Sequence, residues 1–219
     1  MKIIYLHGFL SSPQSYKSQV IGGVVAALSQ DRLRGQLSYY APQLPDLVSK
    51  ADSFVRQLCE DELKAGERIA LCGSSLGGLL ALRSAFFYEL RCCVINPLLL
   101  RPGAKPLENM RGTVVQNPYT GRKIIVTDEE LDLLYELSCF RQFRPGKIKA
   151  FISSGDEVVD PALTAEIFCK CGLDYTLLRG GNHDFFEIDR YAASLLDFLL
   201  IEPAPHPQKE VVWGHGEDN

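Results

Sequence analysis

The chain has 219 residues, of which 46% are hydrophobic and 23% are charged, so it can form one domain with a substantial core. The formal net charge of −4, without a basic arm, argues against a nucleic-acid partner and against attachment to an acidic membrane surface. No stretch approaches about 18 consecutive apolar residues, and the first residues lack the pattern of a secretory leader. We therefore predict a cytoplasmic protein without stable membrane insertion.

The chain contains seven cysteines, an odd number, and many of them stand in apolar runs. They are Cys59, Cys72, Cys92, Cys93, Cys139, Cys169 and Cys171. This distribution is typical of buried free thiols. Cys169 and Cys171 are separated by a single residue, and no partner pair of cysteine or histidine has the spacing of a zinc site. We predict no metal and no cofactor.

Six strand-like segments alternate with helical patterns of apolar residues. The segments are residues 2–6, 37–41, 68–72, 91–95, 148–153 and 174–179. Strands that alternate with helices form a mostly parallel sheet through right-handed crossovers, and the helices cover both faces. The sequence therefore predicts a three-layer α/β fold with about six strands, in a single domain over residues 1–201.

The first of these segments ends at His7, Gly8 and Phe9. We predict that the backbone amides of Phe9 and, further along the chain, Leu76 form an oxyanion hole, which stabilises negative charge that develops in a transition state. Gly8 lets the backbone approach a substrate closely. His7 is predicted to shape this loop rather than to act as a base, because it ends a strand that already has a positional role.

The third segment is followed by the residues Gly73-Ser-Ser-Leu-Gly77 and then by a helical run rich in leucine and alanine. This is the context of a G-x-S-x-G nucleophile elbow, in which a tight strand-to-helix turn presents the central serine. Side chains two residues to either side would collide in that turn, which accounts for glycine at both positions. Ser75 is therefore the candidate nucleophile.

Residues 97–146 separate the fourth and fifth segments, whereas such a connection usually has about 2–6 residues. We expect a lid-like insertion. Within it, Thr127 and Glu130 fit a capping box ahead of Leu131 and Leu134, which predicts one short helix. The apolar face of this helix could cover an acyl pocket or pack on the sheet, because its pattern does not identify the surface that it meets.

Two carboxylates follow the fifth segment, and each is a candidate for the acid that orients a histidine base. A serine hydroxyl is a poor nucleophile at neutral pH, so it needs a histidine base and an acid that orients this base. Asp156 stands at the carboxyl end of the strand, where an α/β-hydrolase sheet carries its acid. Asp160 precedes Pro161 and a helical run, which fits an N-cap with proline at the first helical position. We therefore prefer Asp156 as the acid.

His183 lies in the loop after the sixth segment, behind two glycines and an asparagine. With an unperturbed pKa of about 6.5, a histidine can take the serine proton and return it to a leaving group. The chain order Ser75, Asp156, His183 is that of the triad in α/β-hydrolases. This order favours a base over an ordinary loop histidine, and it predicts the three-layer α/β-hydrolase fold.

Several motifs together resemble one family, the YqiA-like small bacterial esterases of the α/β-hydrolase superfamily. They begin at Tyr5, Ala41, Gly73, Ile95, Gln116, Ser154 and Gly180 and read YLHGFLSSP, APQLP, GSSLG, INP, QNPYTG, SGDEVV and GGNH. The resemblance covers residues 1 to about 200. It implies a cofactor-free, cytoplasmic hydrolase of carboxylic esters or acyl thioesters, with the triad on Ser75, Asp156 and His183. The polar, proline-containing tail 202–219 departs from the pattern.

Three hypotheses of function fit these residues, and a serine peptidase or a lipase is open beside them. The leading hypothesis is two-step acyl transfer to water, with small acyl esters or thioesters as substrates. An acyltransferase would use the same triad and exclude water beneath its insertion. A noncatalytic ligand-binding protein on a hydrolase scaffold is the third, because a fold alone does not establish a function. Acyl length and oligomeric state are not encoded in any of these motifs.

Overall fold

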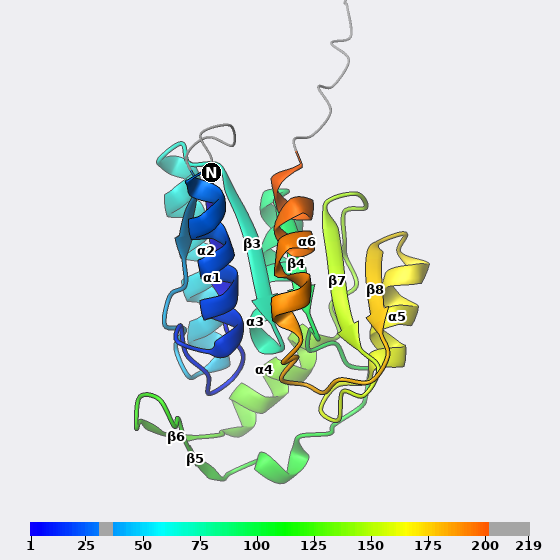
Figure 1. Ribbon diagram of the computed structural model, residues 1–219. Helices are drawn as coiled ribbons and strands as arrows, with labels where there is room; N and C mark the ends of the chain where they lie inside the picture. Colours follow the sequence, from blue (N-terminus) through cyan, green and yellow to red (C-terminus); the bar gives the residue numbers. More distant parts are fainter. Residues whose placement is uncertain (31–36, 202–219) are drawn as a thin grey trace, which may run out of the picture.

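A computed structural model describes residues 1–30 and 37–201 (Figure 1). Its centre is a six-stranded sheet in the order β2-β1-β3-β4-β7-β8, and every neighbouring pair is parallel. The strands are β1 (Lys2–Leu6), β2 (Ser38–Tyr40), β3 (Ile69–Ser74), β4 (Arg91–Ile95), β7 (Ile148–Ser153) and β8 (Asp174–Leu178). All six predicted strands are thus confirmed: β1, β4 and β7 have the predicted ends, and the ends of the other three differ by at most two residues.

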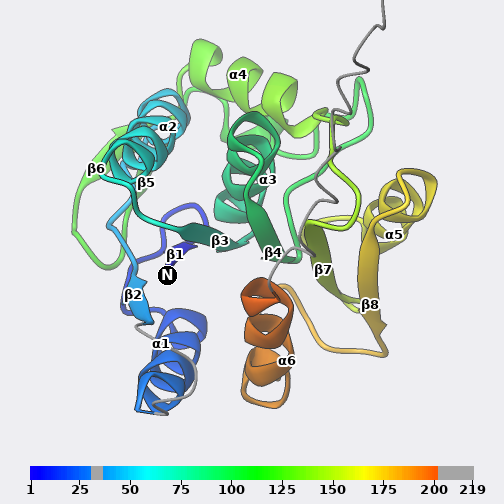
Figure 2. The same ribbon diagram turned by 90° about the horizontal axis from the view of Figure 1, so that it is seen from above.

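Helices cover both faces of this sheet, as Figure 2 shows. One face carries α1 (Tyr16–Ser29) and α6 (Ile188–Leu200), and the other carries α2 (Val48–Lys64), α3 (Leu76–Tyr88) and α5 (Pro161–Lys170). Alternate side chains of each central strand enter two separate apolar cores, one on each face. The chain therefore has the predicted three layers, and the carboxyl ends of the parallel strands meet at one edge, where their loops can converge.

The long insertion between β4 and β7 lies across that edge (Figure 1). It contains a single 3₁₀ turn, η1 (Glu108–Met110), an antiparallel hairpin of β5 (Val114–Gln116) and β6 (Lys123–Ile125), and α4 (Asp128–Ser138). The helix was predicted, whereas the hairpin was not, because strands of three residues are too short to show a period-2 pattern. The helix α4 of the insertion contacts α2.

The predicted capping box of α4 forms only in part. The Thr127 side chain accepts a hydrogen bond from the Glu130 amide at 3.4 Å, so Thr127 is the N-cap. The Glu130 carboxylate does not return to this cap. It accepts hydrogen bonds from the amide and the hydroxyl of Ser49, in the first turn of α2. A competing partner on another helix, which no local pattern contains, explains the difference.

The prediction for the cysteines was right in bonding and only partly right in burial. All seven are free, and Cys59, Cys72, Cys92 and Cys93 are buried, but Cys169 near the end of α5 is exposed. Among the described residues, no helix is both long and apolar enough to cross a bilayer. The tail 202–219 lies outside the described residues.

Candidate active site

The candidate nucleophile lies in a tight turn between β3 and α3. Ser75 has φ of 54° and ψ of −123°, a strained combination for a residue other than glycine. The flanking glycines permit the turn. A Cβ atom on Gly73 would overlap the backbone of Gly77, and a Cβ on Gly77 would overlap the carbonyl oxygens of Leu6 and His7 in the neighbouring strand. The steric reason predicted for both glycines is therefore confirmed.

The three residues proposed from chain order come together in hydrogen-bonding contact. The Oγ atom of Ser75 lies 3.0 Å from Nε2 of His183. The Nδ1 atom of His183 lies 2.8 Å and 3.0 Å from the two carboxylate oxygens of Asp156. Because Nδ1 faces a carboxylate, it carries the proton and leaves Nε2 free to accept one from the serine hydroxyl.

Asp156 is held as a buried, hydrogen-bonded carboxylate. Its side chain is 0% exposed, and Oδ1 accepts hydrogen bonds from the amides of Val158 and Val159 at 2.8 Å and 2.9 Å. Asp160 has the other role that was predicted for it, since its side chain accepts from the Leu163 amide at 3.1 Å and caps α5. The structure thus places Asp156, and not Asp160, against the histidine.

Two further residues hold the histidine loop in place. Asn96 is buried directly after β4, accepts a hydrogen bond from the Ser153 amide at 2.8 Å, and donates to the carbonyl oxygens of Asn182 and His183. Glu157 accepts from the His183 amide at 3.1 Å. The sequence reasoning assigned no role to either. The available signal for Asn96 was an asparagine directly after a strand, a residue that tolerates its φ of 42°.

The predicted oxyanion loop lies beside the nucleophile. A Cβ atom added to Gly8 would lie 3.3 Å from Cβ and 3.8 Å from Oγ of Ser75. In the described part of the chain, the amides of Phe9 and Leu76 donate no hydrogen bond to the protein, and Leu76 opens α3, where the first amides lack intrahelical partners. Both amides are therefore available to an acceptor at this edge of the sheet.

His7 anchors this loop from behind. Its Nε2 accepts a hydrogen bond from the Leu44 amide at 3.0 Å, which requires a proton on Nδ1, and Nδ1 lies 2.9 Å from the Gly8 carbonyl oxygen. Burial lowers the pKa of His7, and its hydrogen bond to Gly8 opposes that shift. The neutral ring joins the loop to the segment before α2, as expected of a residue that shapes the loop.

A cavity of about 300 Å³ opens beside Ser75. Its inner wall is mostly apolar, and the insertion supplies much of it. The insertion residues that line it are Leu98, Leu107, Met110, Ile124, Ile125, Val126, Glu130, Leu131 and Leu134. The apolar face of α4 thus contributes to the pocket through Leu131 and Leu134, and it also packs toward α2. We considered two alternatives for the apolar face of α4, covering a pocket or packing on the sheet. In the structure this face covers the pocket.

The fold is that of the α/β-hydrolases. Est1E of Butyrivibrio proteoclasticus superposes with a TM-score of 0.67 at 14% identity, over 91% of this chain and 86% of Est1E. A monoacylglycerol lipase of Paleococcus ferrophilus superposes with a TM-score of 0.63 at 16% identity, over 91% and 93% of the two chains. At such low identity the likeness concerns the fold, and it confirms the predicted fold class.

The family follows from the sequence comparison. Residues 2–200 match the model of the uncharacterised protein family UPF0227, and the chain belongs to that family. A UPF0227 protein of Klebsiella pneumoniae is 27% identical over 168 residues, which cover 75% of this chain and 81% of that protein. The chain is thus a UPF0227 member with the α/β-hydrolase fold, while the YqiA-like identification stays a prediction.

Proposed function

We propose that this protein is a serine hydrolase that cleaves carboxylic esters or acyl thioesters, in the manner of a YqiA-like esterase. The observation that carries the proposal is the continuous chain of short contacts from Ser75 Oγ through His183 to the buried Asp156. Such an arrangement turns a weak hydroxyl nucleophile into a reactive one, because the base is oriented and the charge that it acquires is balanced.

The reaction would proceed in two steps. Ser75 Oγ attacks the carbonyl carbon while His183 Nε2 takes its proton, and the Phe9 and Leu76 amides stabilise the negative oxygen. His183 then returns the proton to the leaving alcohol or thiol, which leaves an acyl-enzyme. Water then gives a proton to the same histidine and attacks the acyl carbon, and the histidine passes that proton to Ser75 Oγ as the carboxylic acid leaves.

The cavity supports an apolar acyl group as the part of the substrate that is buried. A volume of about 300 Å³ lies at the lower end of the range for small-molecule sites, about 300–1,000 Å³. The lipase similar in fold is described as acting on monoacylglycerols, and Est1E has a structure with bound ferulic acid. Both facts concern those proteins, and they favour an ester of a carboxylic acid as the first substrate to test.

The test is hydrolysis of a series of p-nitrophenyl esters and acyl thioesters of increasing chain length. We expect Ser75→Ala to lower kcat at least about a thousandfold, because the nucleophile is lost. Ser74→Ala is the matched control, since Ser74 is buried next to Ser75 but bonds to the Tyr5 hydroxyl at 3.1 Å. Adding an alcohol acceptor measures partition of the acyl group, and preferential transfer to it would indicate the acyltransferase.

The proposal fails if the native protein hydrolyses none of these substrates, or if Ser75→Ala remains fully active. In either case the ligand-binding hypothesis becomes the next to test. A chain-length optimum in the native protein would measure the depth of the pocket.

A further inference from the structure

One cation lines the active-site cavity and takes no part in the proposed reaction. Among the described residues that form the cavity wall, Lys17 is the only lysine or arginine. Its Nζ donates a hydrogen bond to the backbone carbonyl of Asp184, the residue after His183, at 2.6 Å. An ammonium group has three donors, so this contact leaves donors of Lys17 available to a ligand.

In the part of the chain that the structure describes, Lys17 forms no ion pair, which distinguishes it from other basic residues near the site. Arg101 pairs with Asp160 and Glu166, and Arg111 pairs with three carboxylates. These arginines are neutralised by the protein itself. The structure gives no ion pair between Lys17 and the exposed Asp184 carboxylate, and the charges of Asp184 and Asp156 act on Lys17 without direct contact, so the Lys17 charge is not neutralised in the same way.

The position of Lys17 is not explained by the stability of its helix. It stands in the first turn of α1, where the helix dipole disfavours a cation. Burial also lowers the pKa of Lys17, although the charges of Asp184 and Asp156 oppose this shift. A residue that is locally unfavourable in two respects, and that lines a catalytic cavity, is a candidate for a functional role.

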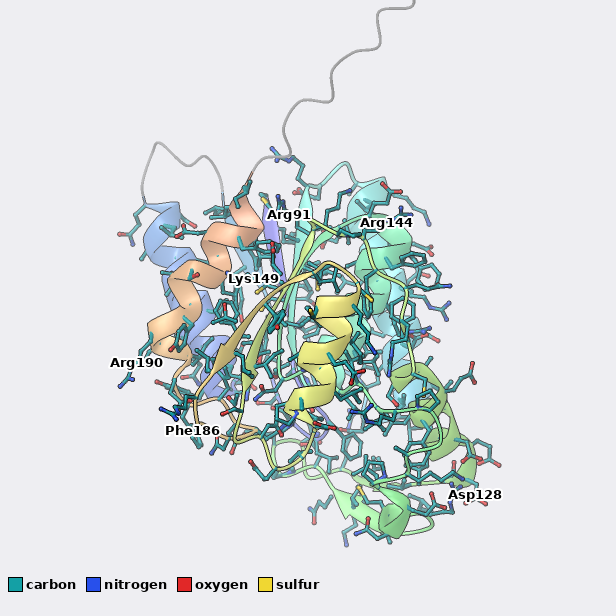
Figure 3. The ribbon with its side chains drawn as sticks, turned by 90° about the vertical axis from the view of Figure 1, so that its right-hand side faces the viewer. Arg91, Asp128, Arg144, Lys149, Phe186 and Arg190 are labelled. Carbon is teal, nitrogen blue, oxygen red and sulfur yellow. The ribbon has the colours of Figure 1, made fainter. Side chains whose placement is uncertain are left out.

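The place of Lys17 identifies the part of the substrate that it would meet. The acyl group is assigned to the apolar wall formed by the insertion. The leaving group must lie beside His183, which gives it a proton, and Lys17 contacts the histidine loop at the next residue. Tyr16 and Phe186 flank this position at the surface, with ring centroids 6.5 Å apart, and Figure 3 shows Phe186 near the start of α6.

We infer that Lys17 binds an anionic group, a carboxylate or a phosphate, on the leaving-group side of the substrate. This inference rests on the proposed hydrolase function and adds a substrate class to it. The ammonium would donate a charge-assisted hydrogen bond to the anion, and the exposed rings of Tyr16 and Phe186 would provide an apolar surface for the part that joins the anion to the scissile bond.

The experiment compares three butyrate esters of phenols that differ at one position. The 4-carbamoylphenyl ester is neutral, the 4-carboxyphenyl ester carries a carboxylate, and the 4-(phosphonomethyl)phenyl ester carries a phosphonate in place of a phosphate. The value of kcat/KM is measured for each ester with the native protein, Lys17→Met, Lys17→Arg and Lys50→Met. Lys50 is the matched control, because it is an exposed first-turn lysine of α2 outside the cavity wall.

For Lys17→Met we expect the ratio of kcat/KM for an anionic ester to kcat/KM for the neutral ester to fall about tenfold or more, the size of a lost hydrogen bond to a charged group. Lys17→Arg should keep most of the ratio, and Lys50→Met should keep all of it. Intrinsic reactivity cancels, because each ester is compared with itself in two proteins. The larger loss among the two anionic esters identifies carboxylate or phosphate as the preferred group.

An equal loss on all three esters would overturn the inference and assign Lys17 to positioning the His183 loop through the Asp184 carbonyl. An unchanged ratio would overturn it as well. In both cases the native protein still hydrolyses the neutral ester, so the proposed function stands. If the native protein hydrolyses none of the esters and none of the chain-length series, the proposed function fails and this inference fails with it.

Discussion

The carboxyl edge of the sheet and the insertion over residues 97–146 both form the cavity, but they are held in place differently. At the sheet edge, backbone geometry fixes Ser75, because it follows β3 directly and any side chain at Gly77 would overlap the end of β1. A main-chain hydrogen bond from the Leu98 amide to the Ser75 carbonyl oxygen, at 3.0 Å, ties the start of the insertion to this turn. The hairpin and α4, by contrast, reach the start of α2 through side chains. The position of Ser75 is thus set by main chain, and that of the hairpin and α4 by side chains.

Two polar side-chain links join the insertion to the segment at the start of α2. Asn117 is buried, and its side-chain amide donates a hydrogen bond to Asp46 at 2.6 Å. Its Oδ1 atom accepts hydrogen bonds from the amides of Tyr119 and Thr120 in the hairpin turn. Glu130 accepts from Ser49 at the start of α2. The links end at Asp46, which lines the cavity, and at Ser49, which follows the cavity residue Val48. We therefore expect a change in these contacts to reshape the cavity more than it displaces Ser75, Asp156 and His183.

The largest effect expected at the sheet edge comes from the carboxylate that orients His183. Asp156→Asn should lower kcat by about a thousand- to ten-thousandfold, since an amide neither balances the imidazolium charge nor selects the correct tautomer. Asp160→Asn is the matched control, because asparagine caps a helix about as well as aspartate. Steady-state hydrolysis of a short ester measures both. A larger loss in Asp160→Asn than in Asp156→Asn would reverse the assignment of the acid.

The difference between local backbone geometry and contacts of distant side chains explains how much of the fold and of the candidate site the sequence predicts. The strands and the candidate triad lie in short, strongly patterned segments, where steric demands on Gly73 and Gly77 are visible in the sequence. Asn96, by contrast, acts through residues 57 and 86–87 positions away, which no local pattern encodes. The Glu130 carboxylate likewise finds its partner 81 positions away on another helix. The role of each triad residue, the YqiA-like identification and the cytoplasmic location stay predictions.

His7 offers a pH-dependent test of the loop that presents the Phe9 amide. His7→Phe removes the acceptor of the buried Leu44 amide, so the free energy of unfolding at pH 8 should fall by about 1–3 kcal/mol. Burial lowers the pKa of His7 in the folded state, so the unfolded state binds the proton more readily. The native protein should therefore lose this stabilisation as the pH falls through about 6.5, the value for an unfolded histidine.

Urea unfolding of both proteins between pH 8 and pH 5 measures this effect. The difference in free energy of unfolding between native protein and His7→Phe should shrink as the pH falls, because the unfolded chain binds a proton at His7 that the folded protein, which needs a neutral His7 to accept from Leu44, does not bind. A difference that stays constant over this range would show that Nε2 of His7 is not the acceptor that holds the loop.

The smallest expected effect is that of a substitution in the insertion on the free energy of unfolding. In Glu130→Gln the side chain keeps an oxygen acceptor for Ser49 but loses the charge that favours the start of α2, so the free energy of unfolding should fall by about 0.3–1 kcal/mol. Glu129→Gln is the control, since Glu129 is an exposed neighbour in the same first turn of α4. Thermal unfolding measures stability, and hydrolysis of short and long acyl esters measures kcat and KM.

We expect kcat on a short ester to stay within about twofold of the native value in Glu130→Gln, because the contacts that hold Ser75 and the His183 loop do not involve Glu130. Any change should appear in KM for the long ester, which fills the wall that α4 provides through Leu131 and Leu134. A loss of kcat on the short ester comparable to that of Asp156→Asn would mean that the insertion positions the reacting groups themselves, and the separation of pocket from chemistry would have to be abandoned.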